Sequence, residues 1–329
     1  MNTRTETDPA LRPTSLDAFA GQPDVADRLR TMTGAAKRRG EACGHLLFVG
    51  PPGLGKTSLA RIVAQEMGAE ISVAYGPMLT KPDQIADFLL GGISTDGKSV
   101  LFIDEVHRVA GKAQDTLLSA MEDKIVTKLL RLSPRETRPC EIGLPDFTLI
   151  AATTRPGMIA KPMRDRFAAT YALDFYTPQQ LETIVERSAE KLGFAIGDGA
   201  ALEIALRSRG TPRIANHLLR RVRDYAQGWL GLDRADCGIT VNALDREGVD
   251  GAGLDALDVR YLLTIRDRFN GGPAGLDAVA ATMSDDAGTL EELVEPYLLW
   301  SGFVSRTAQG RVLTERAVKH LRFTKGGAR

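Results

Sequence analysis

The sequence predicts an α/β domain whose parallel sheet is covered by helices on both faces, then a small all-helical domain and a C-terminal winged-helix domain. Short apolar runs alternate with helical segments up to residue 175, and amphipathic helices then follow one another to about residue 250. Two helices, a third helix and a short alternating segment complete the chain. Strands alternating with helices are typical of covered parallel sheets. We therefore expect domains at 1–175, 176–250 and 251–329.

The composition is that of an ordinary globular protein. Among 329 residues, 42 Lys and Arg balance 42 Asp and Glu, so net charge identifies no class of partner. The three cysteines, Cys43, Cys140 and Cys237, are scattered and form neither a zinc motif nor a disulfide framework. No apolar run approaches the roughly 20 residues of a membrane span, and the polar N-terminus does not resemble a signal peptide. We expect a cytoplasmic protein without membrane contacts.

In the first domain, two helical segments, 24–40 and 56–68, each end in a glycine. Buried strands are predicted from short apolar runs at 45–50, 99–104 and 147–154. In the second domain, "TPQQLETIVERSAEKLG", "DGAALEIALRSRG" and "TPRIANHLLRRVRDYAQ" predict successive helices with no strand between them. The glycine-rich segment 248–255 is typical of a linker, and a turn at Gln309-Gly310 divides the alternating segment of the winged helix.

The segment "GPPGLGKT" (50–57) predicts a phosphate-binding loop because it matches the P-loop pattern and lies between a predicted strand and a predicted helix. The glycines of the motif are Gly50, Gly53 and Gly55. They let backbone N–H groups turn inward, and the helix N-terminus adds partial positive charge. Lys56 can reach the terminal phosphates, and the Thr57 hydroxyl can bind Mg²⁺. A glycine turn with an incidental lysine is the alternative, which this context disfavours.

Two adjacent acids, Asp104 and Glu105, end the apolar run "LFID". A Mg²⁺ that bridges two phosphates needs a hard oxygen ligand, which Asp104 can supply. Glu105 is suited to orient and deprotonate a water aimed at the terminal phosphorus, so it favours ATP hydrolysis over binding alone. Thr154, at the end of a further strand, can contact the γ-phosphate or this water. The alternative interpretations are two solvated acids and an ordinary strand-end threonine.

Together, six segments resemble the RuvB family, the bacterial Holliday-junction branch-migration motors of the AAA+ class. The segments are "GPPGLGKTSLA", "LFIDEVHR", "LIAATTRPGMI", "MRDRF", "SRGTPRIANHLLRRVRDYA" and "GFVSRTAQGRV". The first two are typical of any AAA+ ATPase, whereas the last two are particular to this family. The similarity extends from about Leu11 to the C-terminus.

The resemblance implies an ATP- and Mg²⁺-dependent hexamer that pulls duplex DNA through Holliday junctions. The implied processes are homologous recombination, recombinational repair and the SOS response to DNA damage. The implied partners are duplex and four-way-junction DNA, the junction-binding protein RuvA and, through the assembly, the resolvase RuvC.

The resemblance also implies roles for individual residues. Nucleotide contacts are implied for Leu11, Arg12, Gly53, Lys56, Thr57, Ser58, Glu122, Asp123, Tyr176 and Arg213. Thr154 matches the first sensor, and Arg213 matches the second. Arg166, in "RDRF", matches an arginine finger that points into the neighbouring subunit's nucleotide and neutralises charge on the transferring phosphoryl group.

Arg306 and Arg311 match the DNA-contacting arginines of the wing. They flank a turn, so a two-stranded wing can present both to the phosphates of one duplex. For each of these arginines the alternative is an ordinary surface residue.

The sequence departs from the family at Lys124, which replaces an aromatic or apolar residue, and at Gln309, which replaces a basic wing residue. The insertion 125–144 corresponds to the β-hairpin by which the family docks on its junction-binding partner. Here the insertion is unusually basic, with cations at Lys128, Arg131, Arg135 and Arg138. Leu129, Leu130 and Leu132 are candidates for an apolar tip.

Two other classes of protein are weighed against the motor. A clamp-loader-like or initiator-like ATP switch would bind DNA without translocating, and initiators read base edges with a recognition helix. The cations of the last domain cluster around its wing instead. A P-loop kinase would exclude water, whereas the Asp104-Glu105 pair is suited to activate it.

Overall fold

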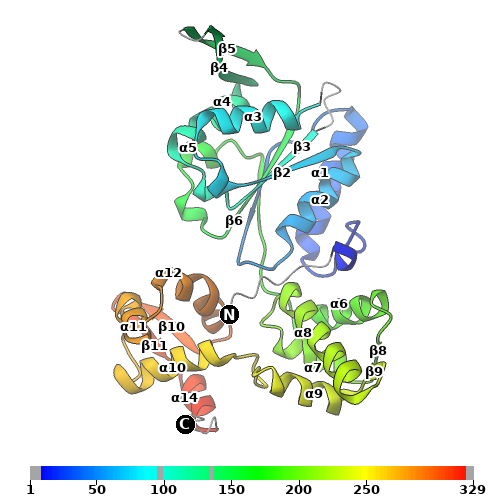
Figure 1. The fold of residues 1–329 in the computed structure, drawn as a ribbon, viewed down its shortest axis with the longest axis vertical. Coiled ribbons are helices and arrows are strands. Elements are labelled where there is room, and N and C mark those ends of the chain that lie inside the picture. The colour runs from blue at the N-terminus through cyan, green and yellow to red at the C-terminus, as the bar shows by residue number, and fades with distance from the viewer. Residues whose placement is uncertain (1–8, 95–98, 134–135, 324–329) are drawn as a thin grey trace. The chain divides into compact units, whose positions relative to one another are not determined.

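The computed structural model describes residues 9–94, 99–133 and 136–323, with the side chains of 130–137 and 323 left undescribed. The chain divides into two compact units, Asp8–Asp174 and a second that contains Phe175–Arg329 (Figure 1). Among the described helices, none is both long and apolar enough to cross a bilayer.

A five-stranded parallel sheet forms the centre of the first unit. In spatial order its strands are β2 (Glu70–Tyr75), β3 (Ser99–Asp104), β6 (Thr148–Thr153), β1 (Leu46–Val49) and β7 (Ala169–Ala172). The register pairs Val49 with Thr153 and Ile103 with Ala151, so the carboxyl ends of these strands meet at one edge. The central strands are buried on both faces, which explains their continuous apolar sequences.

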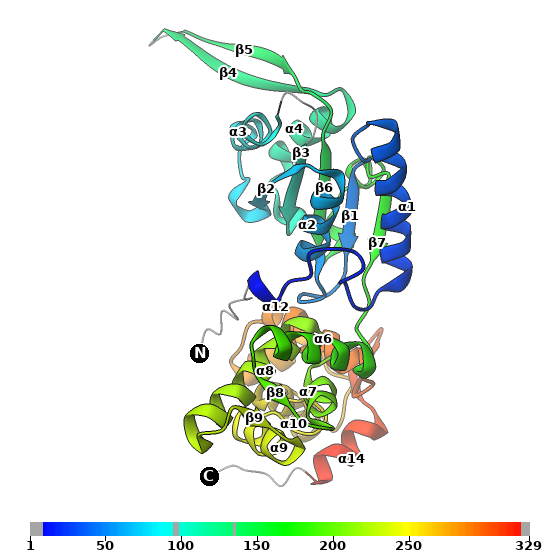
Figure 2. The same cartoon turned by 90° about the vertical axis from the view of Figure 1, so that its right-hand side faces the viewer.

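Helices cover both faces of this sheet (Figure 2). The helices of the first unit are η1 (Pro9–Leu11), α1 (Pro23–Arg39), α2 (Lys56–Met67), η2 (Gly76–Met78), α3 (Pro82–Gly92), η3 (Val106–Arg108), α4 (Gly111–Glu122), η4 (Pro156–Met158) and α5 (Lys161–Arg164). Leu101, Ile103 and Leu149 pack with α3 and α4 in one buried cluster. Because side chains alternate along a strand, the buried side chains of Phe102 and Ile150 point to the other face of the sheet. The predicted α/β class is confirmed.

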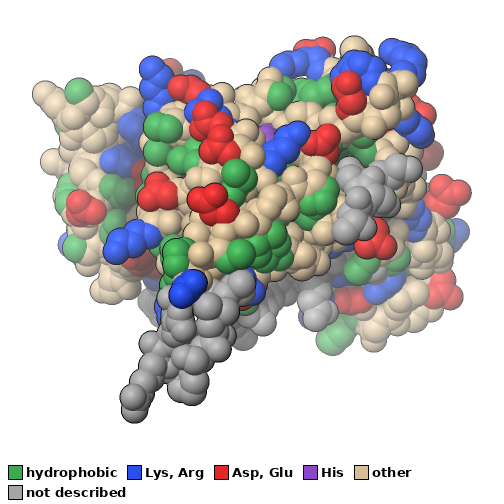
Figure 3. Space-filling view, turned by 90° about the horizontal axis from the view of Figure 1, so that it is seen from above, with side chains coloured by type: hydrophobic (Ala, Val, Ile, Leu, Met, Phe, Trp, Pro, Cys, Tyr) green, Lys and Arg blue, Asp and Glu red, His purple; other side chains and the backbone are tan. Residues whose placement is uncertain are grey.

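The insertion after α4 forms an antiparallel hairpin of β4 (Ile125–Ser133) and β5 (Glu136–Gly143), as the resemblance implied. Lys124 closes its base, because its carbonyl accepts from Leu144 N (2.7 Å) and its ammonium pairs with Asp146. Lys128 pairs with Asp87 (2.6 Å). Figure 3 shows acidic and basic side chains interspersed on the face seen from above. Of the four basic residues predicted for the hairpin, Lys128 therefore has an acidic partner.

Part of the predicted hairpin tip lies outside the described side chains, namely Leu130, Arg131, Leu132 and Arg135. Leu129, the one described member of the predicted apolar tip, has a relative exposure of 57%. The tip therefore stays a prediction.

The second unit begins with the helical lid. Its elements are α6 (Pro178–Lys191), β8 (Ala195–Ile196), α7 (Ala200–Arg207), α8 (Pro212–Tyr225), η5 (Ala226–Leu230), β9 (Arg234–Ala235) and α9 (Cys237–Arg246). The prediction that no strand interrupts these helices is wrong in one detail, because β8 and β9 pair in parallel. Strands of two residues are too short to produce an alternating pattern that a sequence would reveal.

The winged-helix domain follows in the same unit. Its elements are α10 (Ala256–Arg268), α11 (Leu276–Met283), α12 (Ala287–Thr289), η6 (Leu290–Val294), α13 (Glu295–Trp300), β10 (Val304–Thr307), β11 (Gly310–Leu313) and α14 (Glu315–Phe323). The two strands form an antiparallel wing around the predicted turn, and the domain has its own buried apolar cluster. The predicted linker is ordered by Asp250, whose carboxylate accepts from Ala252 N and Leu254 N and contacts His320 of α14.

Candidate nucleotide site and DNA-binding surface

The loop between β1 and α2 has the backbone of a phosphate cradle. Gly53 and Gly55 have φ values of 86° and 99°, which side chains disfavour, and α2 starts immediately afterwards at Lys56. Gly50 N donates to Thr153 O (3.2 Å), which ties the start of the loop to the end of β6. Backbone N–H groups at a helix N-terminus favour bound anions. The local sequence therefore builds an anion site at the carboxyl edge of the sheet.

Lys56 lies inside this loop, with a relative exposure of 7%. Its ammonium donates to the carbonyls of Gly50 (2.7 Å) and Pro51 (2.8 Å). An arriving triphosphate offers stronger, charged acceptors at the same place. Lys56 can therefore exchange carbonyl contacts for phosphate contacts without leaving the loop.

The residues beside the loop fit a magnesium ion. Thr57 lies in the first turn of α2 and Asp104 ends β3 at the same sheet edge, so they offer a hydroxyl and a carboxylate oxygen. Magnesium is commonly held by one or two carboxylates, with substrate phosphates and water completing its shell. Across the described residues, no cluster of three or more His, Cys, Asp or Glu side chains forms a complete protein cage. This donor set therefore suits a metal that arrives with its nucleotide.

Glu105 occupies a strained turn directly after β3. Its φ of 52° and ψ of 48° are left-handed, which is uncommon for a residue with a side chain. Gly76 permits the turn, since a Cβ at that position would lie 2.2 Å from the carbonyl oxygen of Glu105. The Glu105 carboxylate accepts from the Thr154 hydroxyl at 3.1 Å. The predicted base and the predicted first sensor are therefore in direct contact.

Two residues that the sequence did not predict, His107 and Thr153, support this pair. Buried His107 places its Nδ1 3.2 Å from Oε2 of Glu105 and 2.9 Å from Oγ1 of Thr153. Arg155 N donates to the same Thr153 hydroxyl at 3.0 Å. A histidine two residues after the acidic pair is the only sequence signal for this arrangement. Its role depends on the short helix η3, which turns His107 back toward Glu105.

Arg166 lies at the opposite edge of the sheet. It precedes β7, and Ala168 N donates to His45 O (2.8 Å) just before β1 begins. Its guanidinium pairs with Glu122 (2.5 Å) at the end of α4, and the two side chains are 41% and 48% exposed. Helix α4 begins near the carboxyl edge of the sheet and ends near the amino-terminal edge. Glu122 and Asp123, at the end of this helix, therefore also lie at the amino-terminal edge. None of these three residues lies at the edge that carries the chain's own phosphate loop.

The remaining predicted nucleotide contacts are distributed over both units. In the first unit, Leu11 is buried in η1, and Arg12 N closes this turn by donating to Pro9 O. Ser58 follows Thr57 in α2. In the second unit, buried Tyr176 donates its backbone N–H to Gly210 O (2.9 Å), and burial raises the pKa of its phenol.

Arg213 is exposed in the first turn of α8, near the positive end of the helix dipole. Within the described part of the chain, its guanidinium has no ion pair or hydrogen bond. It is therefore suited to an anionic ligand, as the sequence predicts.

Arg306 and Arg311 face each other across the wing, but both guanidinium groups contact Glu295. This glutamate is 0% exposed and accepts from Arg311 (2.6 and 3.1 Å), Arg306 and the Tyr261 hydroxyl (2.6 Å). Burial alone would raise the pKa of Glu295, but these hydrogen bonds lower it below its usual value.

The two wing arginines differ in exposure. The Arg306 side chain is 47% exposed, whereas that of Arg311 is 14% exposed. Arg306 is therefore the better presented to a ligand. Gln309, at the tip of the wing, is exposed and donates its backbone N–H to the Thr307 hydroxyl.

The parallel sheet, the phosphate loop, the acidic pair and the helical lid define a P-loop ATPase of the AAA+ class. Family models agree over nearly the whole chain. They match the Holliday junction DNA helicase RuvB P-loop domain at 11–173, the RuvB AAA lid domain at 176–250 and the RuvB C-terminal winged helix domain at 251–322. The chain belongs to the RuvB family of Holliday junction branch-migration motors.

Solved structures are similar over the same length. The RuvB Holliday junction branch migration motor of Thermotoga maritima is 42% identical, with a TM-score of 0.86 over 96% of this chain and 99% of that chain. Two single-residue variants of that protein are also 42% identical, each with a TM-score of 0.87, and cover 96% and 95% of this chain.

Proposed function

We propose that this chain works as a hexameric ring in which each ATP is hydrolysed between two subunits, and that the ring pulls duplex DNA through four-way junctions. The observation that carries this proposal is the position of Arg166. An arginine at the amino-terminal edge of the sheet cannot complete a site at the carboxyl edge, so it serves a neighbouring subunit. A contact that repeats head to tail closes into a ring, and the number six comes from the family resemblance.

The residues of one subunit divide the chemistry at the carboxyl edge. Lys56 and the loop amides bind the phosphates, while Leu11, Arg12 and Ser58 hold the rest of the nucleotide. Thr57 and Asp104 would hold Mg²⁺, which neutralises phosphate charge when bound. Glu105 orients a water and takes its proton, and Thr154 fixes the carboxylate that does so. His107 supports this carboxylate from its buried side.

The neighbouring subunit supplies Arg166, with Glu122 and Asp123 beside it. In a single chain Arg166 pairs with Glu122, and the γ-phosphate of the adjacent subunit is a more highly charged partner. A guanidinium at this position stabilises charge on the transferring phosphoryl group. Release of phosphate then alters the contacts of Arg213 and Tyr176, and the lid moves.

The winged-helix domain is the proposed DNA grip. Arg306, and Arg311 when it leaves Glu295, contact backbone phosphates. Binding should therefore be independent of base sequence and should weaken as salt rises. The β4–β5 hairpin is the proposed docking element for RuvA, and RuvC would join through the assembly. The cellular roles are homologous recombination and recombinational DNA repair, including the SOS response.

Movement of a synthetic four-way junction tests this function. With ATP and Mg²⁺, the purified chain should convert the junction into duplex products, and the junction-binding partner should increase the rate. The nonhydrolysable analogue of ATP should give no products. An ATP switch that only binds DNA would instead retain the junction under all these conditions, and that outcome would contradict the proposal.

A further inference from the structure

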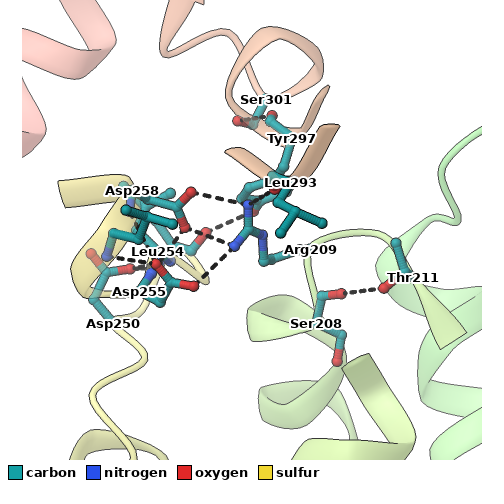
Figure 4. Close-up of polar contacts among 12 residues, drawn as sticks. Ser208, Arg209, Thr211, Asp250, Leu254, Asp255, Asp258, Leu293, Tyr297 and Ser301 are labelled. Atoms are coloured by element: carbon teal, nitrogen blue, oxygen red, sulfur yellow. Dashed lines mark hydrogen bonds and ion pairs between the residues drawn. The ribbon is translucent and has the colours of Figure 1, made fainter. Parts of the chain in front are cut away.

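The turn between α7 and α8 reaches into the winged-helix domain through Arg209 (Figure 4). The Arg209 guanidinium forms a two-pronged pair with Asp258, at 2.9 and 3.0 Å. It also contacts Asp255 (3.2 Å) and donates to Leu293 O (3.0 Å). It lies over the ring of Tyr297, 5.1 Å from the centroid. One lid residue therefore contacts α10, η6 and α13.

Hydrogen bonds from backbone N–H groups fix both aspartates independently of Arg209. Asp255 caps α10 by accepting from Leu257 N (2.8 Å) and Asp258 N (3.0 Å). Asp258 returns the contact by accepting from Asp255 N (3.0 Å). Asp258 is 0% exposed, and a buried carboxylate without a counter-ion is costly. Arg209, whose side chain is 12% exposed, therefore supplies the counter-ion that the buried carboxylate of Asp258 requires.

The same turn is held on its other side by the lid. Gly210 O accepts from Tyr176 N, and the Thr211 hydroxyl caps α8 by accepting from Ile214 N. Phe175 packs so closely on Gly210 that an added Cβ would lie 2.9 Å from its side chain. Trp300 of α13 in turn contacts Phe175, with ring centroids 5.0 Å apart. The turn is thus tied to the winged-helix domain in two ways, directly through Arg209 and indirectly through Phe175, which contacts Trp300.

Arg209 is four residues before Arg213, the residue with which α8 is proposed to contact nucleotide. The intervening chain is fixed by the cap of α8, so a displacement of the first turn of α8 also displaces Arg209. Because the Arg209 contacts are charged and directional, α10 must follow or the contacts must break. This geometry provides a short path from a nucleotide-contacting helix to the DNA-binding domain.

We propose that Arg209 couples the lid to the winged-helix domain, so that the change sensed at Arg213 is delivered to bound DNA. The inference rests on the proposed DNA-motor function. Arg209 is a positioning residue in this scheme, because it acts through α10 and α13. A purely structural contact would affect ATP turnover and DNA movement in the same proportion, whereas a coupling residue affects their ratio.

The first test compares Arg209→Gln with wild type, measuring ATP turnover and junction movement in the same samples. Junction movement per ATP should fall about tenfold while ATP turnover changes less, within the range typical of coupling between distant sites. Arg209→Lys keeps the charge but loses the two-pronged geometry, so its ratio should be intermediate. Equal losses of both activities, or no change in their ratio, would contradict coupling.

Arg260→Gln is the matched control. Arg260 forms an exposed pair with Asp285 (2.7 Å) inside the winged-helix domain, and this pair does not reach the lid. The same chemical change there should leave the ratio of movement to ATP turnover at its wild-type value. A comparable fall in this control would show that the ratio reports a general disturbance of the domain and would overturn the assignment to Arg209.

Hydrogen exchange separates failure of this inference from failure of the proposed function. In wild type, addition of ATP or ADP should change the exchange rates of the amides of residues 255–258, and in Arg209→Gln it should not. This readout requires no DNA movement. If wild type moves no junction yet shows this nucleotide effect, the motor function fails and the coupling stands. If nucleotide leaves these amides unchanged in wild type, the coupling is wrong.

Discussion

Glu105 combines a strained backbone with a well-supported side chain. Its left-handed turn is possible because Gly76 leaves space for it, and its carboxylate is held by Thr154 and His107. Strain that persists at a polar residue in a ligand site is often linked to function. Here it places a carboxylate beside the phosphate loop in a defined orientation before nucleotide arrives.

Replacing Glu105 with Gln should separate binding from hydrolysis. Gln retains the size of the side chain and can still accept from Thr154, but it cannot take a proton from water. ATP affinity should stay close to wild type, whereas turnover should fall by about 10²–10⁴-fold. Binding of a fluorescent ATP analogue and phosphate release measure the two quantities.

Glu186→Gln, at an exposed position of α6, is the control and should change neither quantity. Loss of ATP binding in Glu105→Gln would mean that Glu105 is needed to assemble the site rather than to activate water.

The first turns of α10 and α13 each bury an acid that has arginine partners. Asp258 faces Arg209 and Asp255, and Glu295 faces Arg311, Arg306 and Tyr261. Removing one partner of a buried ion pair leaves a charge without compensation. These short elements therefore depend on residues distant in the sequence, and their stability should depend on pH and on single charges.

Asp258 should make stability depend on pH. Burial raises its pKa to about 7, although Arg209 opposes this shift. Between its usual pKa of 3.8 and this value, the folded chain binds a proton that the unfolded chain has released. Stability should therefore fall as pH rises through this window. Asp258→Asn should flatten the dependence by on the order of 2 kcal/mol between pH 5 and 8.

Urea unfolding of both proteins at several pH values measures this effect. Parallel curves for wild type and Asp258→Asn would show that other groups cause the pH dependence. Asp285→Asn is the control, because the carboxylate of Asp285 is partly exposed, and this substitution should leave the pH dependence of the wild type intact.

Replacing each of the two wing arginines with Met should have different effects on stability and on DNA binding. Arg311→Met leaves buried Glu295 without its main partner and should lower the free energy of unfolding by about 3 kcal/mol. Arg306→Met should destabilise less and should reduce the slope of log affinity for duplex DNA against log salt by about one. Thermal unfolding and DNA titrations at several salt concentrations measure both. An unchanged salt slope in Arg306→Met would exclude a phosphate contact.

The sequence predicts the parts of the molecule that depend on local patterns. Buried strands β1, β3 and β6 are recognisable because both of their faces are apolar. The edge strand β2 was missed because it exposes residues such as Val73 and Tyr75, at 49% and 43%. The phosphate loop and the pair Asp104-Glu105 are contiguous motifs, so their positions were also accessible.

Contacts between distant segments could not be predicted in this way. Thr153 and His107 are 46 residues apart, and Arg209 and Asp258 are 49 residues apart. No periodicity relates such residues, and only the folded chain brings them together. The same reason explains why Arg306 and Arg311 were predicted as DNA contacts without their shared partner Glu295.

Two edges of one sheet define how the whole molecule is proposed to work. The carboxyl edge carries Lys56, Asp104 and Glu105, whereas the amino-terminal edge carries Arg166 and Glu122. In the proposed mechanism, a single chain thus carries the two halves of a site at opposite edges of the sheet. Copies arranged head to tail would bring each finger to the next phosphate loop, and the lid and winged-helix domain would convert the reaction into movement of DNA.

Mixing two inactive variants tests this shared site most directly. Arg166→Ala retains an intact phosphate loop, and Lys56→Ala retains an intact finger, so each variant alone should hydrolyse ATP very slowly. In an equal mixture that assembles at random, about a quarter of the interfaces combine both intact halves, and ATP hydrolysis should return to a comparable fraction of the wild-type rate. If no mixing ratio exceeds the sum of the separate variants, ATP is not hydrolysed at a site shared between subunits.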